Sequence, residues 1–353
     1  MPTPLPRDAD PWRPLAGVHV LEIAPYLPGP HAGQLLAELG AAVIKVEPPG
    51  GDPARALQAG LYTANNRGKR SVCVDLKSPA AAAVIARLAA WADVVIEGHK
   101  PGVAARLGID YATLRTHQPR LVYAALTGYG QSGPDAGLPG HDINYLAAGG
   151  ALARCGHWHG PPRRTGLPLA DLAGSLHAAL GIVAAVHEAR ASGRGRFLDV
   201  SLTAAALRLA AARGLDAAAR AHLHPTNDLF VTRDGQTLAA ALIEDHFYAR
   251  FAAALKVHWP ALDDPAYATV AARQTAGDAL HALLVDIFAS RTLEDWLALA
   301  DAHALPLSPV RDPAGAHAAL YPDLPHPPVP IATDAPANIP APAPDRAGGN
   351  RAG

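Results

Sequence analysis

Cysteine is scarce in this sequence, and its scarcity excludes two kinds of site. Only Cys73 and Cys155 occur among 353 residues, and neither belongs to a CxxC pair. The sequence therefore indicates neither a disulfide framework nor a zinc–thiolate site, and it fits a reducing compartment. His157 and His159 lie close to Cys155, but their spacing matches no zinc template, so we predict no metal site.

An excess of charge of either sign is also absent. Lys and Arg number 30 against 31 for Asp and Glu, which gives no general attraction to nucleic acid or to an anionic membrane. Polar residues interrupt the Ala-rich stretches before they reach the ~20 apolar residues of a membrane helix. Residues 1–14 lack the apolar core of a signal peptide. We therefore expect a soluble, cytoplasmic protein with no nucleic-acid or membrane partner.

The turn after the first predicted strand lacks a dinucleotide fingerprint, although strands and helices alternate in the first half of the sequence. No GxGxxG follows the first predicted strand, so a dinucleotide cofactor is not supported. Strands are expected at 18–23, 42–47, 71–76, 93–97, 121–126 and 196–200, and helices at 31–39, 79–92, 111–117, 142–152 and 171–190. This alternation favours an α/β fold with a mostly parallel sheet covered on both faces.

The second half of the sequence changes character at residue 227. Predicted strands at 228–231 and 236–243 flank Asp234 and Gly235, a strong hairpin signal. Helices are expected at 245–255, 276–289 and 292–303, the last with a capping box of Thr292 and Asp295. We predict a large α/β domain over 1–205, a linker over 206–226 and a smaller α+β domain over 227–310. The Pro- and Ala-rich segment 311–353 is expected to be extended and disordered toward its end.

Seven stretches occur in the order typical of one known family. They are PLAGVHVLEIAPYLPGPHAGQLLAELGAAVIKVEPPGGDPAR (14–55), NRGKRSVCVDLK (66–77), ADVVIEGHKPGVAARLGI (92–109), LTGYGQSGP (126–134), GHDINY (140–145), PLADLAGS (168–175) and GRGRFLDVSL (193–202). Together they resemble the family III CoA-transferases, the CaiB/BaiF type. The resemblance implies a Rossmann-like large domain, an interlocked homodimer and a C-terminal segment that returns to the large domain. It also implies an acyl-CoA substrate, with coenzyme A as part of the substrate and no permanently bound cofactor.

Within this family, the GHDINY motif resembles the α-methylacyl-CoA racemase branch. In that branch the His of this motif and the Asp of PLADLAGS form an acid/base couple, which implies these roles for His141 and Asp171. A further catalytic Glu of that branch is matched by Glu244. Racemising the α-carbon of a thioester requires a proton to leave one face and return to the other, so two groups must flank the carbon. We therefore expect a racemase or epimerase of 2-methyl-branched acyl-CoA thioesters that works through an enolate.

The enolate oxygen and the phosphates of CoA both require polar partners. Asp171 is expected at a helix N-terminus, where backbone amides are placed to stabilise an oxyanion. We expect these amides to be those of Leu172, Ala173 and Gly174. Basic residues in loops after predicted strands are candidates for CoA binding, because α/β folds bind ligands there. They are Lys45, Arg67, Lys69 and Lys100, and Tyr129 of the LTGYGQSGP motif is expected to join them.

Two other functions stay open. In the transferase branch, the same Asp is a nucleophile that attacks the thioester and forms a mixed anhydride. Asp171 alone therefore does not separate the two chemistries, whereas His141 favours proton transfer. A non-catalytic acyl-CoA-binding protein is the third possibility, because residues 213–227 are shorter than the matching segment of the family and lack its Gly-Gly-x-Pro-x-Tyr stretch. A separate, purely structural interpretation of Asp171 is that of a helix N-cap.

Overall fold

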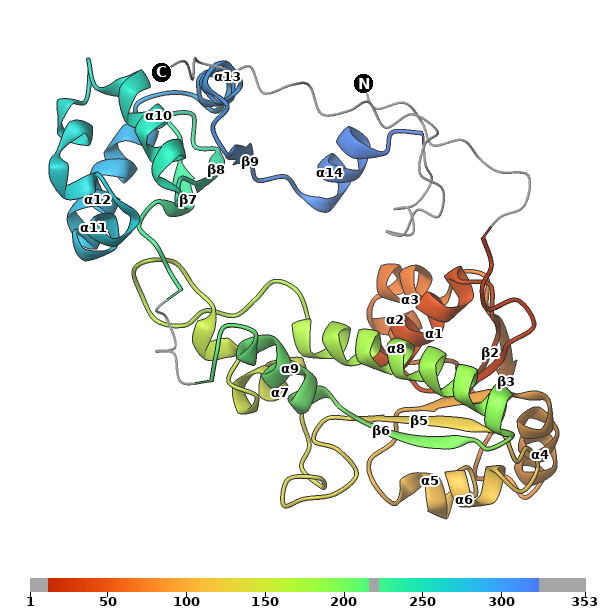
Figure 1. Ribbon diagram of the computed structural model, residues 1–353. Coiled ribbons are helices and arrows are strands. Elements are labelled where there is room, and N and C mark those ends of the chain that lie inside the picture. The colour runs from red at the N-terminus through yellow and green to blue at the C-terminus, as the bar shows by residue number, and fades with distance from the viewer. Residues whose placement is uncertain (1–11, 216–221, 324–353) are drawn as a thin grey trace, which may run out of the picture.

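Two separate sheets organise the chain. The computed structural model describes residues 12–215 and 222–323, and these form two bodies, each built around one sheet (Figure 1). The larger sheet has six strands in the order β3-β2-β1-β4-β5-β6, and the smaller has three in the order β7-β8-β9. The predicted α/β fold with a smaller antiparallel part is thus confirmed, while the predicted domain boundaries stay a prediction.

The six-stranded sheet is parallel in every pairing. Its strands are β1 (His19–Ile23), β2 (Ala42–Glu47), β3 (Arg70–Cys73), β4 (Val94–Glu97), β5 (Val122–Thr127) and β6 (Arg196–Ser201). This is the Rossmann strand order, in which the connections turn in opposite directions from β1 and β4. A crevice opens where those two strands end, and folds of this kind bind their ligands there.

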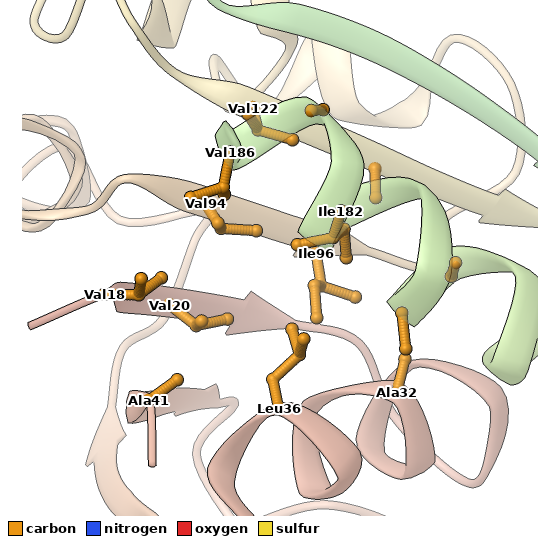
Figure 2. Packing of buried hydrophobic residues seen from close by; sticks show 14 of the residues in the cluster. Val18, Val20, Ala32, Leu36, Ala41, Val94, Ile96, Val122, Ile182 and Val186 are labelled. Carbon is orange, nitrogen blue, oxygen red and sulfur yellow. The ribbon is translucent and has the colours of Figure 1, made fainter. Parts of the chain in front are cut away.

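Helices cover both faces of this sheet. They are α1 (Pro28–Glu38), α2 (Ala54–Leu57), α3 (Ala59–Asn66), α4 (Ala81–Trp91), α5 (Val103–Arg106), α6 (Tyr111–Leu114), α7 (Asp142–Ala148), α8 (Leu169–Ser192) and α9 (Leu202–Ala211). On one face, Leu36 of α1 and Ile182 of α8 join Val20 and Ile96 of the sheet in one buried cluster (Figure 2). On the other face, α4 packs over the sheet through Ile85 and its neighbours.

Helix α8 packs on the six-stranded sheet and carries Asp171 near its N-terminus. Its length and composition would allow it to cross a membrane, but half of its most apolar stretch is buried inside the protein, as in a core helix. It begins at Leu169 rather than at the predicted Asp171, with Pro168 as N-cap. Asp171 therefore lies within the first helical turn, a difference that matters for the amides discussed below.

The smaller body has an aromatic core. Strands β7 (Asn227–Val231) and β8 (Thr237–Ala241) form the predicted antiparallel hairpin, and β9 (Leu307–Pro309) pairs with β8. Its longer helices are α10 (Asp245–Leu255), α11 (Val270–Thr275), α12 (Gly277–Phe288) and α13 (Leu293–His303). Phe288 stacks on Phe230 with ring centroids 4.5 Å apart, and Trp296 lies 4.9 Å from Phe288. The capping box predicted at Thr292 and Asp295 is present at the start of α13.

The last described segment contains a helix where an extended chain was expected. Helix α14 (Pro313–Leu320) is capped by Asp312, whose carboxylate accepts the Gly315 N–H, and it has no buried residue. In Figure 1 it stands apart from the helices of both bodies. The predicted disorder of the end, and its return to the large domain, concern residues beyond 323 and lie outside the described residues.

Candidate active site

A cavity lies at the carboxyl edge of the six-stranded sheet, hereafter the switch-point cavity. Its volume is about 300 Å³, and its lining includes Tyr26 after β1, Lys100 after β4 and Tyr129 after β5. Gly29 brings α1 close to the end of β1, because a Cβ at this position would overlap the Cβ of Ala24. The cavity therefore occupies the place where the strand order makes a ligand site available.

His141 and Asp171 both line the switch-point cavity. His141 directly precedes α7, and Asp171 belongs to the first turn of α8, so two different helices bring them to one space. The His141 residue is exposed, whereas Asp171 is only partly accessible. An imidazole and a carboxyl group that face the same cavity provide the pair of groups that proton transfer at a carbon requires.

The environment of Asp171 prepares it for proton transfer. Burial, followed by the nearby charge of Asp142, raises the pKa of Asp171 from 3.8 to about 7. Both the acid and the carboxylate are therefore populated near neutral pH, as expected of a group that must alternately give and accept a proton. Strongly raised carboxyl pKa values in a cavity are also a general mark of functional sites.

Tyr145 forms a wall of the cavity beside Asp171. Its hydroxyl donates to the Gly140 carbonyl at 2.5 Å, and its ring meets that of Tyr129 edge-on at 5.2 Å. Burial raises the pKa of Tyr145 to about 12, so the hydroxyl stays protonated. Gly128 and Gly140 leave room for this ring, because a Cβ at either would overlap it. Tyr145 was not predicted as a site residue, although it ends the GHDINY motif.

Lys45 and Lys69 do not lie where the sequence predicted them. The Lys45 ammonium is 1% exposed and lies 2.8 Å from Glu22 Oε1 and 2.9 Å from Asp52 Oδ2. That of Lys69 is 2% exposed and lies 2.7 Å from Glu22 Oε2. Burial lowers the pKa of Lys69 to about 8, against the opposing effect of Glu22. Both ammonium groups are paired with buried carboxylates, so they are not placed to bind phosphate, contrary to the prediction.

The other predicted ligand-binding side chains divide between the cavity and the surface. Lys100 and Tyr129 line the switch-point cavity, and their role in CoA binding stays a prediction. Arg67 instead donates to Glu38 at 3.2 Å and to the Ala64 carbonyl at 2.9 Å, and it lines neither of the large cavities. Of the five basic and aromatic residues predicted to bind CoA, the structure thus brings two, Lys100 and Tyr129, to the switch-point cavity.

The predicted oxyanion amides are occupied within helix α8. Because this helix begins at Leu169, the Leu172 N–H donates to the Pro168 carbonyl at 3.0 Å. Ala173 and Gly174 are buried farther along the helix, where their amides belong to its internal hydrogen bonds. Gly174 faces Leu202, which a Cβ would overlap. These three amides therefore do not point into the cavity, contrary to the prediction.

Glu244 lies in the other body of the chain. It is the N-cap of α10, which Figure 1 shows in the smaller body, whereas α7 and α8 belong to the larger one. The switch-point cavity is lined by residues between 24 and 202 only. Within this one chain, Glu244 therefore does not join His141 and Asp171.

A second cavity, of about 560 Å³, adjoins the first across Tyr26 and His99, which line both. The ends of β2 and β3 contribute to its walls, together with Lys77 and with Arg106 of α5. Both cations are exposed. Neither was predicted from the sequence, although Lys77 closes the NRGKRSVCVDLK stretch and follows a predicted strand. We refer to this space as the basic cavity.

His157, near Cys155, contacts a carboxylate of the smaller body. His157 Nδ1 lies 2.9 Å from Asp228 Oδ1, and His281 Nε2 lies 3.3 Å from Asp228 Oδ2. The same carboxylate accepts the Trp158 N–H at 2.9 Å, so this loop joins the two bodies. Within residues 12–215 and 222–323, no group of three or more His, Cys, Asp or Glu side chains is placed to hold a metal ion.

Comparison with known proteins places this site in a family. The model of CoA-transferase family III matches residues 15–323, which includes both bodies. The chain belongs to CoA-transferase family III. Membership supports an enzyme that acts on CoA thioesters, and it confirms the resemblance seen in the ordered motifs.

Relatives of this family III chain include both transferases and racemases. A succinate–glutarate CoA-transferase of Agrobacterium fabrum is 42% identical over 203 residues, which cover 54% of this chain and 51% of that protein. The human α-methylacyl-CoA racemase is 32% identical over 317 residues, covering 84% of this chain and 77% of the racemase. Among solved structures, a CaiB/BaiF family protein from Brucella suis is 31% identical with a TM-score of 0.77, covering 86% of each chain.

Proposed function

We propose that this family III enzyme racemises or epimerises CoA thioesters of 2-methyl-branched acids. The observation that carries the proposal is the placement of His141 and Asp171 on one cavity, with the pKa of Asp171 raised to about 7. An acid and a base at neutral pH are what exchange of an α-proton requires. Leu138 and Leu202 line the same cavity and offer apolar surface for a short branched acyl group.

The proposed reaction needs no second substrate. One of the two groups accepts the α-proton, and the electron pair of the broken C–H bond moves onto the thioester oxygen as an enolate. The other group donates its proton to the opposite face of the α-carbon, which forms the new C–H bond. His141 and Asp171 exchange roles for the two enantiomers, so the enzyme returns to a reactive state for the reverse substrate.

The basic cavity suits the nucleotide end of the thioester. A CoA thioester carries phosphates, and the exposed ammonium of Lys77 and guanidinium of Arg106 line this space. The two cavities adjoin at Tyr26 and His99, so one extended ligand can occupy both, with its acyl end beside Asp171. Lys100, on the wall of the switch-point cavity, adds a further positive charge along this path.

A homodimer in the cytoplasm forms part of the proposal. Glu244 lies in a different body from the cavity of its own chain, so its proposed catalytic role requires the smaller body of a second copy. Cross-linking and light scattering test the dimer. A Glu244→Gln chain mixed with a His141→Ala chain tests the shared site, because a mixed dimer retains one intact site if the two residues come from different copies.

The test of the proposed reaction is incubation with a single enantiomer of a 2-methylacyl-CoA in heavy water. Incorporation of α-deuterium together with loss of optical purity, in the absence of any free acid, supports racemisation. Transfer of CoA to an added acid, without α-deuterium, contradicts it.

Transfer of CoA between dicarboxylic acids is the second candidate function. It is favoured by the 42% identity to a protein named succinate–glutarate CoA-transferase and by the exposed Lys100 ammonium, which suits a carboxylate acceptor. In this reaction Asp171 attacks the thioester carbonyl and CoA thiolate leaves, which gives a mixed anhydride. CoA thiolate then attacks the Asp171 carbonyl of the anhydride and releases the first acid as its carboxylate, which leaves CoA bound to Asp171 as a thioester. The carboxylate of the second acid attacks this thioester and displaces CoA thiolate, and the thiolate attacks the new acyl carbonyl, which releases Asp171 and the second CoA thioester. Labelled succinate or glutarate would then become labelled CoA thioester, and Asp171→Asn would abolish the labelling.

A further inference from the structure

Asp142 connects the two elements that carry the proposed acid and base. It follows His141 directly in the chain and opens helix α7. Its Oδ1 accepts the Ala170 N–H at 2.8 Å and the Asp171 N–H at 3.2 Å. One carboxylate thus joins the residue beside His141 to the backbone of Asp171 itself.

The two amides held by Asp142 belong to a helix end that has no cap of its own. The first N–H groups of a helix lack partners within it, and the N-cap of α8 is Pro168, which makes no side-chain hydrogen bond. Asp142 supplies the missing acceptor from another helix. Its negative charge also interacts favourably with the positive N-terminal end of the dipole of the 24-residue helix α8. A small apolar cluster of Leu146 and Ala170 holds α7 against α8 behind it.

We infer that Asp142 is a positioning residue that fixes the proposed base and acid relative to each other. This inference rests on the function proposed above and deepens it. The apolar cluster brings the two helices together, but apolar contacts tolerate small sliding movements. The paired hydrogen bonds at the cavity end determine which turn of α8 meets His141, and proton transfer is sensitive to such placement.

The charge of Asp142 gives the same residue a second effect. It is the second cause, after burial, of the raised pKa of Asp171. The other titratable or charged groups that face the cavity are Tyr26, His99, Lys100, Tyr129, His141 and Tyr145. Among all these groups, Asp142 is the one whose carboxylate bonds the backbone of Asp171, so its charge and its position act together.

Two variants separate the charge of Asp142 from its hydrogen bonds. Asp142→Asn keeps an oxygen acceptor for the two amides and removes the charge, whereas Asp142→Ala removes both. Asp110 provides a matched control, because its carboxylate caps helix α6 by accepting the Thr113 N–H at 3.2 Å, away from both cavities. Asp110→Asn and Asp110→Ala therefore measure the effect of losing a helix cap alone.

The first readout is α-deuterium exchange into a 2-methylacyl-CoA. We expect Asp142→Ala to lower kcat by roughly 100-fold with little change in KM, because the reacting groups are misplaced after the thioester has bound. Asp142→Asn should recover most of this loss, with the pH optimum moved to lower pH. Both Asp110 variants should keep the wild-type rate and pH profile.

The second readout does not depend on turnover. The carbonyl stretch of the protonated Asp171 carboxyl, assigned by its loss in Asp171→Asn, can be followed by infrared spectroscopy as the pH is raised. Its titration should move to lower pH in Asp142→Asn and Asp142→Ala but not in the Asp110 variants. If wild type exchanges no deuterium, the proposed function fails, yet this titration still tests Asp142. The inference is overturned if neither the titration nor the exchange rate of the Asp142 variants differs from those of the Asp110 controls.

Discussion

Replacement of Asp171 by Asn should change how the stability of the protein depends on pH. The unfolded chain ionises this carboxyl from its ordinary pKa of 3.8, whereas burial delays ionisation in the folded protein to about 7. The folded state therefore binds more protons between these values, and wild type loses stability as pH rises through them. A difference of about three pH units corresponds to roughly 4 kcal/mol in total, of which about 2–3 kcal/mol falls between about pH 5 and pH 8.

Urea unfolding of wild type and Asp171→Asn at these two pH values measures the effect. The unfolding free energy of Asp171→Asn minus that of wild type should be about 2–3 kcal/mol larger at the higher pH than at the lower one. Asp110→Asn is the control, because hydrogen bonds to Thr113 outweigh burial and hold the pKa of Asp110 below its usual range. This carboxyl is ionised in the folded and the unfolded chain at both pH values, so its replacement should change the free energy of unfolding by the same amount at both. A difference between wild type and Asp171→Asn that does not depend on pH would refute the assignment of a raised pKa to Asp171.

Three further substitutions test the parts around the site. Lys45→Met leaves Glu22 buried with less compensation, so the unfolding free energy in urea should fall by about 3–5 kcal/mol, and an unchanged value would contradict the buried network. Gly29→Ala forces α1 away from the end of β1, so the free energy of unfolding should fall by about 1–3 kcal/mol and thioester turnover should also fall. Thermal melting and the exchange assay measure these two effects, and wild-type values in both would contradict the close packing at Gly29. Lys77→Ala should raise KM for a CoA thioester by about tenfold without lowering the melting temperature, whereas an unchanged KM would remove the basic cavity from CoA binding.

Local sequence patterns were sufficient to predict most of the fold. Strands β1 and β5 are buried on both faces, so short apolar runs without alternation identified them as parallel strands. The hairpin was predicted from the Asp234-Gly235 pair between two predicted strands. In the structure Gly235 has a φ of +74°, a conformation that Gly adopts easily. Helix α14 was missed because Pro and Ala dominate its surroundings, and no buried face gives it a periodic pattern.

The start of α8 was misplaced because its cap comes from elsewhere in the chain. Sequence rules look for a capping side chain immediately before a helix, and Asp171 satisfied that pattern. The actual acceptor is Asp142, far upstream in the sequence, and the residue before the helix is Pro168. A cap supplied through tertiary structure leaves no local signal, so the amides of the first turn were assigned to the wrong role.

The buried lysine had a signal in the sequence that was not used. Lys45 and Glu22 each lie between apolar residues of a strand, and they stand at the same register position of neighbouring strands β2 and β1. Opposite charges in two adjacent buried strands predict an ion pair, since an isolated buried charge is too costly. Lys45 was grouped with the residues of loops after strands, although the predicted strand at 42–47 contains it. Its place within a buried strand favours an ion pair over a ligand contact.

Deuterium incorporation at the α-carbon tests the central claim most directly. Wild type, His141→Ala and Asp171→Asn would be incubated with a 2-methylacyl-CoA in heavy water without any acceptor acid. An acid and a base acting on the same carbon predict rapid incorporation by wild type and a loss of at least about 100-fold in each variant. Incorporation at the wild-type rate in both variants would show that these two side chains do not act at that carbon.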